Sequence, residues 1–417
     1  MDKNNGAIYD ARKLGKPKMI ILGVQHMFAM FGATILVPIL TGLDISTTLL
    51  MAGLGTLLFH CITKFKVPAF LGSSFAFLGG YAAIKAFSPN DPNSMLPYAC
   101  LGVACAGLIY FILAAVIKAV GIEKVMRFFP PVVTGPIIIA IGLGLAPSAV
   151  SNCTTNWFLA VVALAVIVVF NIWGKGMAKI IPIILGLLIS YGTGLVLYFI
   201  SQANPDLIQN VPWLFSGGAD ANGVYQPIFD FTSLNTICDN ISKGHIFGSE
   251  GLIGIPIHWD KTVFGGIDYS NGALIASSII AIVPIAFATM MEHIGDICAI
   301  SSTTGNNYIK DPGLHRTLVG DGLATTLASL FGGPANTTYG ENTGVLALTR
   351  VYDPRVIRIA AYFAVAVSFF PIVSVIIGSI PSCIIGGISF VLYGMISAIG
   401  VRNVVENKVD FTKSRNL

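Results

Sequence analysis

The sequence predicts an all-α integral membrane protein built from two inverted halves, and three observations support this prediction. The chain has 417 residues, of which 54% are hydrophobic and only 11% are charged, with a mean hydropathy of +0.79. A typical soluble domain has about 25% charged residues. Apolar segments of spanning length recur along the chain, and segments rich in glycine and proline interrupt the third candidate span of each half.

Twelve segments are long and apolar enough to be membrane spans. A spanning helix needs about 20 mostly apolar residues, because the hydrocarbon core of a bilayer is about 30 Å thick. The third and tenth segments follow Pro68 and Pro334 and are rich in Gly, Ser and Thr, so neither is predicted to be one continuous helix. The predicted spans are residues 19–41, 47–63, 67–86, 97–120, 129–149, 156–173, 179–201, 272–297, 316–332, 334–350, 355–380 and 382–401.

The basic residues give this arrangement an orientation. If the N-terminus lies in the cytoplasm, only Lys85, Lys243 and Lys261 of the 24 lysines and arginines fall outside, which leaves 21 at cytoplasmic ends. Cytoplasmic loops of membrane proteins carry an excess of lysine and arginine. We therefore expect a multi-pass protein of the cell membrane with a cytoplasmic N-terminus.

Seven predicted spans precede a long exterior loop at residues 202–271, so the second half starts from the opposite side of the membrane. This organisation predicts a first repeat at 1–201 and an inverted second repeat at 272–417, a design that occurs in transporters. The loop is either a tolerated insertion between the halves or a small packed lid. The aromatic residues that favour a lid are Trp213, Phe215, Tyr225, Phe229 and Phe231.

Several classes of function have no support in the sequence. The seven cysteines form no CxxC pair and no cluster with histidine, so neither a metal site nor a disulfide framework is predicted. No nucleophile with its base and no phosphate-binding loop is apparent, which argues against an enzyme. A channel requires a continuous polar stripe along several helices, whereas the polar residues here gather at one depth.

Four acidic residues fall within predicted spans: Glu292, Asp296, Asp321 and Glu341. A charge at the bilayer centre costs at least about 2.5 kcal/mol, so such residues usually mark ion pathways or proton relays. Glu292 and Asp296 are four residues apart and share one helix face, and a proton carrier is expected to be one of them. Structural roles remain the alternative, above all for Asp321. His26 in the first span is a further candidate, although a lone buried histidine often only satisfies its own hydrogen bonds.

The two interrupted segments point to a binding site at the membrane midplane. Glu341 lies where the tenth segment turns from extended chain into helix, where free N–H groups and the positive end of the helix dipole gather. Gly340 allows a planar ligand to approach the backbone, and Phe75 offers an aromatic face at the matching place in the first half. These groups suit a small, flat, polar solute.

Four motifs resemble the nucleobase–ascorbate transporter family, also called the nucleobase:cation symporters of the second type, and within it the bacterial uracil permeases. The resemblance covers the whole chain except residues 202–271. The motifs are Gln25–Thr34, Leu71–Phe77, Asp311–Arg316 and Asn336–Val345, the last of which contains the family signature from Glu341 to Gly344.

The resemblance implies fourteen segments in two inverted sevens, with one short strand each in segments three and ten. A core domain would comprise about 19–120 and 272–380, and a gate domain about 129–201 and 382–401. No cofactor other than a coupling proton is implied. The partners implied are a nucleobase and the lipid bilayer, without nucleic acid, and a homodimer is left open.

The resemblance also implies roles for individual residues. Glu292 and Glu341 would bond the base, and Glu292 would couple the proton together with Asp296. The other residues carried over are Phe75, Gly340 and Ala33 as the lining of the site, and His26, Asp321, Tyr339 and Asn342 as its supports.

A glutamate at the start of the signature, here Glu341, is typical of uracil permeases. Asp296 stands where those permeases often have a histidine, and Asp321 is similar to a residue of the purine carriers. The expected function is therefore proton-coupled uptake of uracil by alternating access, with xanthine or guanine as the alternative substrate. Since the second repeat has only five predicted spans, we also expect the chain to be a C-terminally incomplete version of a longer transporter.

Overall fold

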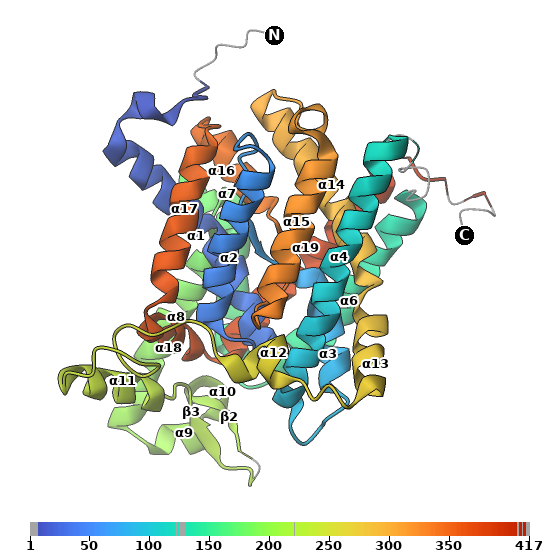
Figure 1. Ribbon diagram of the computed structural model, residues 1–417. Coiled ribbons are helices and arrows are strands. Elements are labelled where there is room, and N and C mark those ends of the chain that lie inside the picture. The colour runs from blue at the N-terminus through green and yellow to red at the C-terminus, as the bar shows by residue number, and fades with distance from the viewer. Residues whose placement is uncertain are drawn as a thin grey trace. The chain divides into compact units, whose positions relative to one another are not determined.

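The computed structural model describes residues 7–121, 124, 131–220, 222–406, 408–410 and 412–413 (Figure 1). At Ala33, Pro131, Thr134 and Glu341 it describes the backbone alone. The chain divides into two compact units: unit 1 comprises residues 1–129, 247–249 and 253–374, and unit 2 comprises residues 130–246, 250–252 and 375–417. The functional roles of core and gate that the resemblance implies for similar ranges stay predictions.

Unit 1 contains most of the helices and one pair of short strands. Pro17 stands in the first turn of its first long helix, where proline lacks only an N–H that has no partner inside the helix. Asp44 caps the second helix by accepting a hydrogen bond from the Thr47 N–H at 2.7 Å. The elements are η1 (Ala11–Leu14), α1 (Lys16–Thr41), α2 (Ile45–Ile62), β1 (Leu71–Ser73), η2 (Phe75–Phe77), α3 (Leu78–Lys85), η3 (Pro92–Met95), α4 (Leu96–Val120), η5 (Trp259–Lys261), α12 (Val263–Gly266), α13 (Gly272–Ile282), α14 (Ile285–Thr304), η6 (Ile309–Gly313), α15 (Leu314–Leu330), β4 (Asn336–Thr338), α16 (Glu341–Thr349), α17 (Pro354–Ser368) and the first half of α18 (Pro371–Gly378).

The two strands β1 and β4 form an antiparallel pair within unit 1. Leu71 lies opposite Thr338, and Ser73 lies opposite Asn336. All six strand residues are buried. Each strand is followed by a helical segment, η2 and α3 after β1 and α16 after β4. The prediction of one short strand in each interrupted segment is therefore confirmed.

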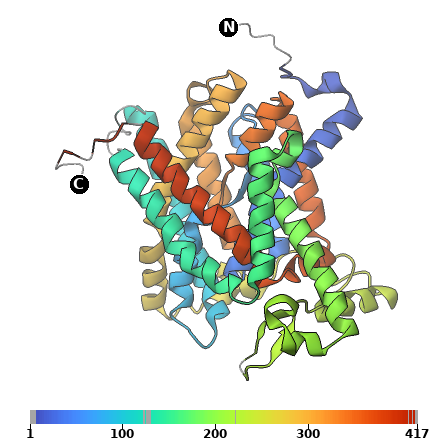
Figure 2. The same ribbon diagram turned by 180° about the vertical axis from the view of Figure 1, so that it is seen from behind.

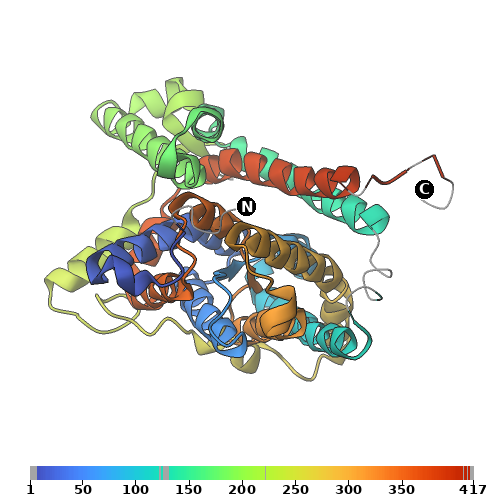
Figure 3. The ribbon, with the colours of Figure 1, turned by 90° about the horizontal axis from the view of Figure 1, so that it is seen from above.

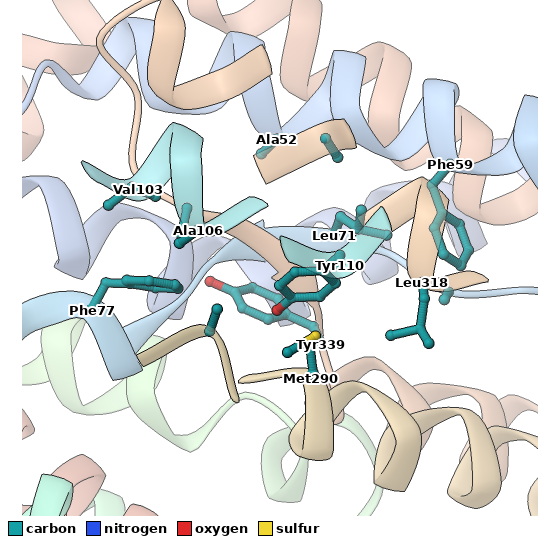
Figure 4. Packing of buried hydrophobic residues seen from close by; sticks show 14 of the residues in the cluster. Ala52, Phe59, Leu71, Phe77, Val103, Ala106, Tyr110, Met290, Leu318 and Tyr339 are labelled. Carbon is teal, nitrogen blue, oxygen red and sulfur yellow. The ribbon is translucent and has the colours of Figure 1, made fainter. Parts of the chain in front are cut away.

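The helices of unit 1 pack closely around this strand pair. Helices α4 and α15 meet at two glycines. A Cβ atom on Gly107 would lie 2.7 Å from the Gly322 carbonyl oxygen, and a Cβ atom on Gly322 would lie 2.6 Å from the Gly107 carbonyl oxygen. Small residues permit such an approach of two backbones in membrane proteins. Figure 4 shows the apolar cluster beside this contact, with Tyr110 and Tyr339 next to Met290.

Unit 2 is built on two long helices that run side by side, α6 and α19 (Figures 2 and 3). A Cβ atom on Gly142 would lie 2.6 Å from the Tyr393 carbonyl oxygen, so here too glycine permits close packing. The elements of unit 2 are α6 (Pro131–Cys153), α7 (Trp157–Trp173), η4 (Gly176–Lys179), α8 (Pro182–Ala203), α9 (Asp206–Asn210), α10 (Pro212–Phe215), β2 (Ser216–Ala219), β3 (Tyr225–Pro227), α11 (Thr232–Ser242), the end of α18 and α19 (Ser382–Glu406).

The unit 2 part of the exterior loop is folded rather than extended. Strands β2 and β3 form a hairpin. The rings of Phe229 and Phe231 stack 5.2 Å apart, and both meet Tyr198 of α8 edge-on. Phe215 is buried as well, whereas the Trp213 side chain is 64% exposed. The Trp213 ring also meets Phe158 of α7 edge-on, so four of the five aromatic residues make packing contacts; whether the loop acts as a lid stays a prediction.

Among the described residues, seven helices are long and apolar enough to cross a membrane. Several predicted spans differ from the structure in shape or length. The span predicted at 355–380 is not one straight helix, because α17 and α18 are long and apolar enough to cross only as a pair that is bent by 87°; Pro371 disfavours helical backbone at the residue before it. The span predicted at 272–297 continues to Thr304, and the one at 382–401 continues to Glu406.

Candidate functional site

The strand pair needs partners for backbone groups that the two strands do not supply to each other. The Thr56 hydroxyl on α2 accepts a hydrogen bond from the Leu71 N–H at 2.9 Å. The Thr325 hydroxyl on α15 donates to the Asn336 carbonyl at 3.0 Å. The Asn336 side chain on β4 donates to the Met51 carbonyl on α2 at 2.7 Å. Non-helical backbone at membrane depth is stable only where protein or water satisfies it. Helices α2 and α15 satisfy these backbone groups.

Tyr339 holds the two strands together from the interior of unit 1. Its side chain is 5% exposed, and its hydroxyl donates to the Ser73 carbonyl at 2.8 Å. The Ser73 hydroxyl in turn donates to the Thr34 carbonyl of α1 at 3.0 Å. Tyr339 therefore connects β4 to β1 and α1, which is consistent with the supporting role expected for it.

Two of the predicted acids lie on α14, which packs against η2, β4 and α16. Glu292 is exposed and Asp296, one turn further along, is half-buried. The Thr338 hydroxyl lies 3.4 Å from Asp296 Oδ2. A Cβ atom on Gly340 would lie only 2.9 Å from Asp296 Oδ1, so this carboxylate reaches the backbone just before α16. Asp296 and Gly340 are therefore neighbours.

Phe75 occupies the corresponding place after strand β1. It begins η2, is half-buried, and packs against the apolar cluster of unit 1. Helix α14 contacts both η2 and α16, so the helix that bears Glu292 and Asp296 adjoins the ends of both strands. Asp296, Gly340 and the start of α16 are thereby neighbours in unit 1.

Two of the predicted site residues have side chains outside the described part of the structure. Glu341 is the first residue of α16, directly after Gly340. Ala33 lies on α1, next to the Thr34 carbonyl that accepts a hydrogen bond from Ser73. Both residues are thus on elements that adjoin the strand pair, and their expected roles at the site stay predictions.

His26 and Asn342 lie together behind the start of α16. Both side chains are almost fully buried, and the Asn342 amide is adjacent to the His26 ring. Neither ring nitrogen of His26 has a hydrogen-bond partner of good geometry among the described residues. These two predicted supports are therefore in contact with each other.

Asp321 is fully buried on α15, and its Oδ1 atom accepts a hydrogen bond from the Thr338 N–H at 2.8 Å. This contact matches the structural role that the sequence left open for Asp321. The same oxygen lies 3.3 Å from Nδ1 of His293, a residue that the sequence interpretation missed. The sequence signal that could have found His293 is its position, since it is a second polar residue directly after Glu292 in a predicted span.

Comparison with known proteins identifies the family and the fold of this chain. A model of the group described as "Permease family" matches residues 17–417. The chain is 39% identical to the uracil permease of Bacillus caldolyticus and 38% identical to that of Bacillus subtilis; in each case the match covers 95% of this chain and 82% of the relative. The transmembrane domain of a cyanobacterial bicarbonate transporter, BicA, superposes with a TM-score of 0.51 at 14% identity over 94% of this chain and 96% of that domain.

The fold is that of the inverted-repeat membrane proteins, and the permease match makes the chain a multi-pass membrane transporter and not an enzyme. Within that class, the chain belongs to the permease family that the match over residues 17–417 defines. The predicted fold class and the resemblance to nucleobase–ascorbate transporters are both confirmed.

Proposed function

We propose that this chain carries uracil across the cytoplasmic membrane together with a proton, by alternating access, with its N-terminus in the cytoplasm. The proposal is supported by the contacts of Asp296 with Thr338 and with the Gly340 backbone at the end of strand β4, on the helix that also bears Glu292 and that adjoins η2, which Phe75 begins. The names of the relatives, which are uracil permeases, favour this pyrimidine over xanthine or guanine.

The groups at this site complement a flat pyrimidine that carries both N–H and C=O groups. A carboxyl group keeps acceptor oxygens whether or not it carries a proton, so Glu292 is proposed to accept a hydrogen bond from a ring N–H. The first turn of α16 has N–H groups without partners inside the helix, and these suit a ring carbonyl. The half-buried Phe75 ring supplies an apolar face for the ring. Glu341 is proposed as the second carboxylate, and Ala33 as part of the lining.

The proton is proposed to bind at Glu292, with Asp296 as its neighbour. The two carboxylates lie one turn apart on α14, so they share one face of the helix. A proton on either of them lowers the negative charge at the site by one. Acidic residues within membrane spans commonly form proton relays. A charge change at the site links proton binding to substrate binding, as symport requires.

Uptake of labelled uracil by cells that lack their own uracil transporter tests this proposal. We expect saturable accumulation that needs expression of this chain and collapses when a protonophore abolishes the proton gradient. Unlabelled uracil should compete better than xanthine or guanine. Accumulation that persists without a proton gradient contradicts proton coupling, and uptake that rises without saturation indicates a channel.

A further inference from the structure

A histidine that has no part in the proposed chemistry lies behind the site. His293 follows Glu292 on α14, but its side chain is 1% exposed. Its Nε2 atom lies 2.9 Å from the Thr317 hydroxyl on α15, and its Nδ1 atom lies 3.1 Å from the Thr338 hydroxyl on β4. Asp321 Oδ1 lies 3.3 Å from the same Nδ1. The imidazole thus joins α14, α15 and β4.

The hydrogen-bond directions around this ring can be deduced from its partners. The Thr317 hydroxyl donates its single proton to the Leu314 carbonyl at 3.0 Å, so it accepts from His293 Nε2–H. The Thr338 hydroxyl donates to Asp296, so it does not donate to Nδ1 as well. The Nδ1 atom faces two oxygens, the Thr338 hydroxyl at 3.1 Å and Asp321 Oδ1 at 3.3 Å, and the hydroxyl contact is the one with hydrogen-bond geometry.

The Asp321 carboxyl group and the His293 ring therefore lie side by side in a buried environment. Both side chains are fully enclosed. The Phe59 ring of α2 packs edge-on near the imidazole, with ring centroids 6.4 Å apart. Buried charges are stable only when they are paired and hydrogen-bonded. The pair is therefore a fixed structural couple rather than a solvent-exposed carrier.

Both members of the couple hold one residue of the site strand. Asp321 accepts from the Thr338 backbone N–H, and His293 meets the Thr338 hydroxyl. Thr338 in turn contacts Asp296 and stands two residues before Gly340. We infer that His293 is a positioning residue: together with Asp321 it fixes Thr338, and through Thr338 it orients the Asp296 carboxylate and the start of α16 toward the substrate.

This inference rests on the proposed function only for the choice of ligand, and the threonine gives its sharpest test. Thr338→Val keeps the shape of the side chain and removes the hydroxyl, whereas Thr338→Ser keeps the hydroxyl. We expect Thr338→Val to weaken binding of labelled uracil to the purified full chain by about tenfold, which is the effect of leaving a buried polar partner unpaired. Thr338→Ser should stay within about threefold of the unmodified protein.

The couple itself is tested by His293→Gln, Asp321→Asn and the double variant. Each single change should weaken binding by roughly tenfold or more, and the double variant should be no weaker than the worse single variant. His60→Gln is the matched control. His60 is another buried histidine, whose Nε2 donates to the Ala69 carbonyl at 2.9 Å, and a glutamine amide can also donate there. Binding of uracil by His60→Gln should weaken by less than about threefold.

Two results would overturn the inference: equal binding by Thr338→Val and Thr338→Ser, or a loss in the double variant equal to the product of the single losses. If the unmodified protein does not bind uracil, the proposed substrate is wrong, and the same variants are compared on xanthine and guanine. The melting temperatures of the four proteins in the His293 and Asp321 cycle need no ligand. Additive shifts in melting temperature would contradict the couple as well.

Discussion

Strands β1 and β4 lie side by side, but their supports differ in chemistry. Behind β1, helix α2 uses the Thr56 hydroxyl and His60, which bonds a carbonyl and has no carboxylate partner among the described residues. Behind β4, helices α14 and α15 use the Asp321–His293 couple. The acids Glu292 and Asp296 also lie on the β4 side. Among these contacts, the side chains behind β1 are a hydroxyl and an imidazole, whereas those behind β4 include a carboxylate.

If proton coupling belongs to the β4 side alone, Glu292→Gln should have the largest effect on transport. Glutamine is close to glutamate in shape but cannot gain or lose a proton. We expect uphill accumulation of uracil to be abolished, while exchange of labelled for unlabelled uracil across the membrane continues. Uptake and exchange in reconstituted vesicles measure the two activities separately.

Asp296→Asn is the matched control for that experiment, since Asp296 lies one turn further along the same face of α14. It should weaken transport without abolishing accumulation. Accumulation by Glu292→Gln at the level of the unmodified protein would mean that the proton travels through another group, and Asp296 would then be examined first.

The breaks in the third and tenth segments were predictable from the sequence because their signal is local: each segment has a proline at its start and is rich in Gly, Ser and Thr. The two strands themselves were implied by the resemblance to the family. The acids on α14 were predictable for a similar reason, since a charge in an apolar run is conspicuous.

The partner network of His293 could not be predicted in the same way. Its contacts Thr317, Asp321 and Thr338 lie 24, 28 and 45 residues away, on other elements. Only the fold brings them together. The bend before Pro371 was missed because the apolar run continues across it, so hydropathy outweighed the effect of proline on the preceding residue.

The second largest effect should be on stability, in a comparison of Asp321→Ala with Thr56→Ala. The first change removes one member of a fully buried pair and leaves both His293 and the Thr338 N–H without it, which costs about 3–5 kcal/mol. The second leaves the Leu71 N–H unpaired, at about 1–3 kcal/mol. Unfolding of the purified proteins in detergent measures both. Equal losses of unfolding free energy in the two variants would mean that the supports of β4 and β1 do not differ in kind.

A smaller effect, on binding rather than on stability, is expected from Gly340→Ala. The added Cβ atom would lie 2.9 Å from Asp296 Oδ1 and would displace this carboxylate, which is the movable end of a side chain. We expect uracil to bind about tenfold more weakly, equivalent to about 1.4 kcal/mol, with little change in melting temperature. Gly344→Ala in the same helix is the control, because no atom lies within 4 Å of its added Cβ. Similar binding by the two variants would separate Gly340 from the site.

The smallest effect is expected from Thr325→Val, which removes the neutral support that α15 gives to β4. Thr325 donates to the Asn336 carbonyl, whereas Thr56 on α2 accepts from a backbone N–H. A buried carbonyl without its partner is tolerated more readily than a buried N–H. We therefore expect a loss of about 1 kcal/mol in unfolding free energy, at the lower end of the range for an unpaired buried group, with binding of uracil unchanged within error. A loss as large as that of Asp321→Ala would show that the neutral and the ionisable contacts hold β4 equally, and the contrast between the two strands would then lie only in the acids that face the substrate.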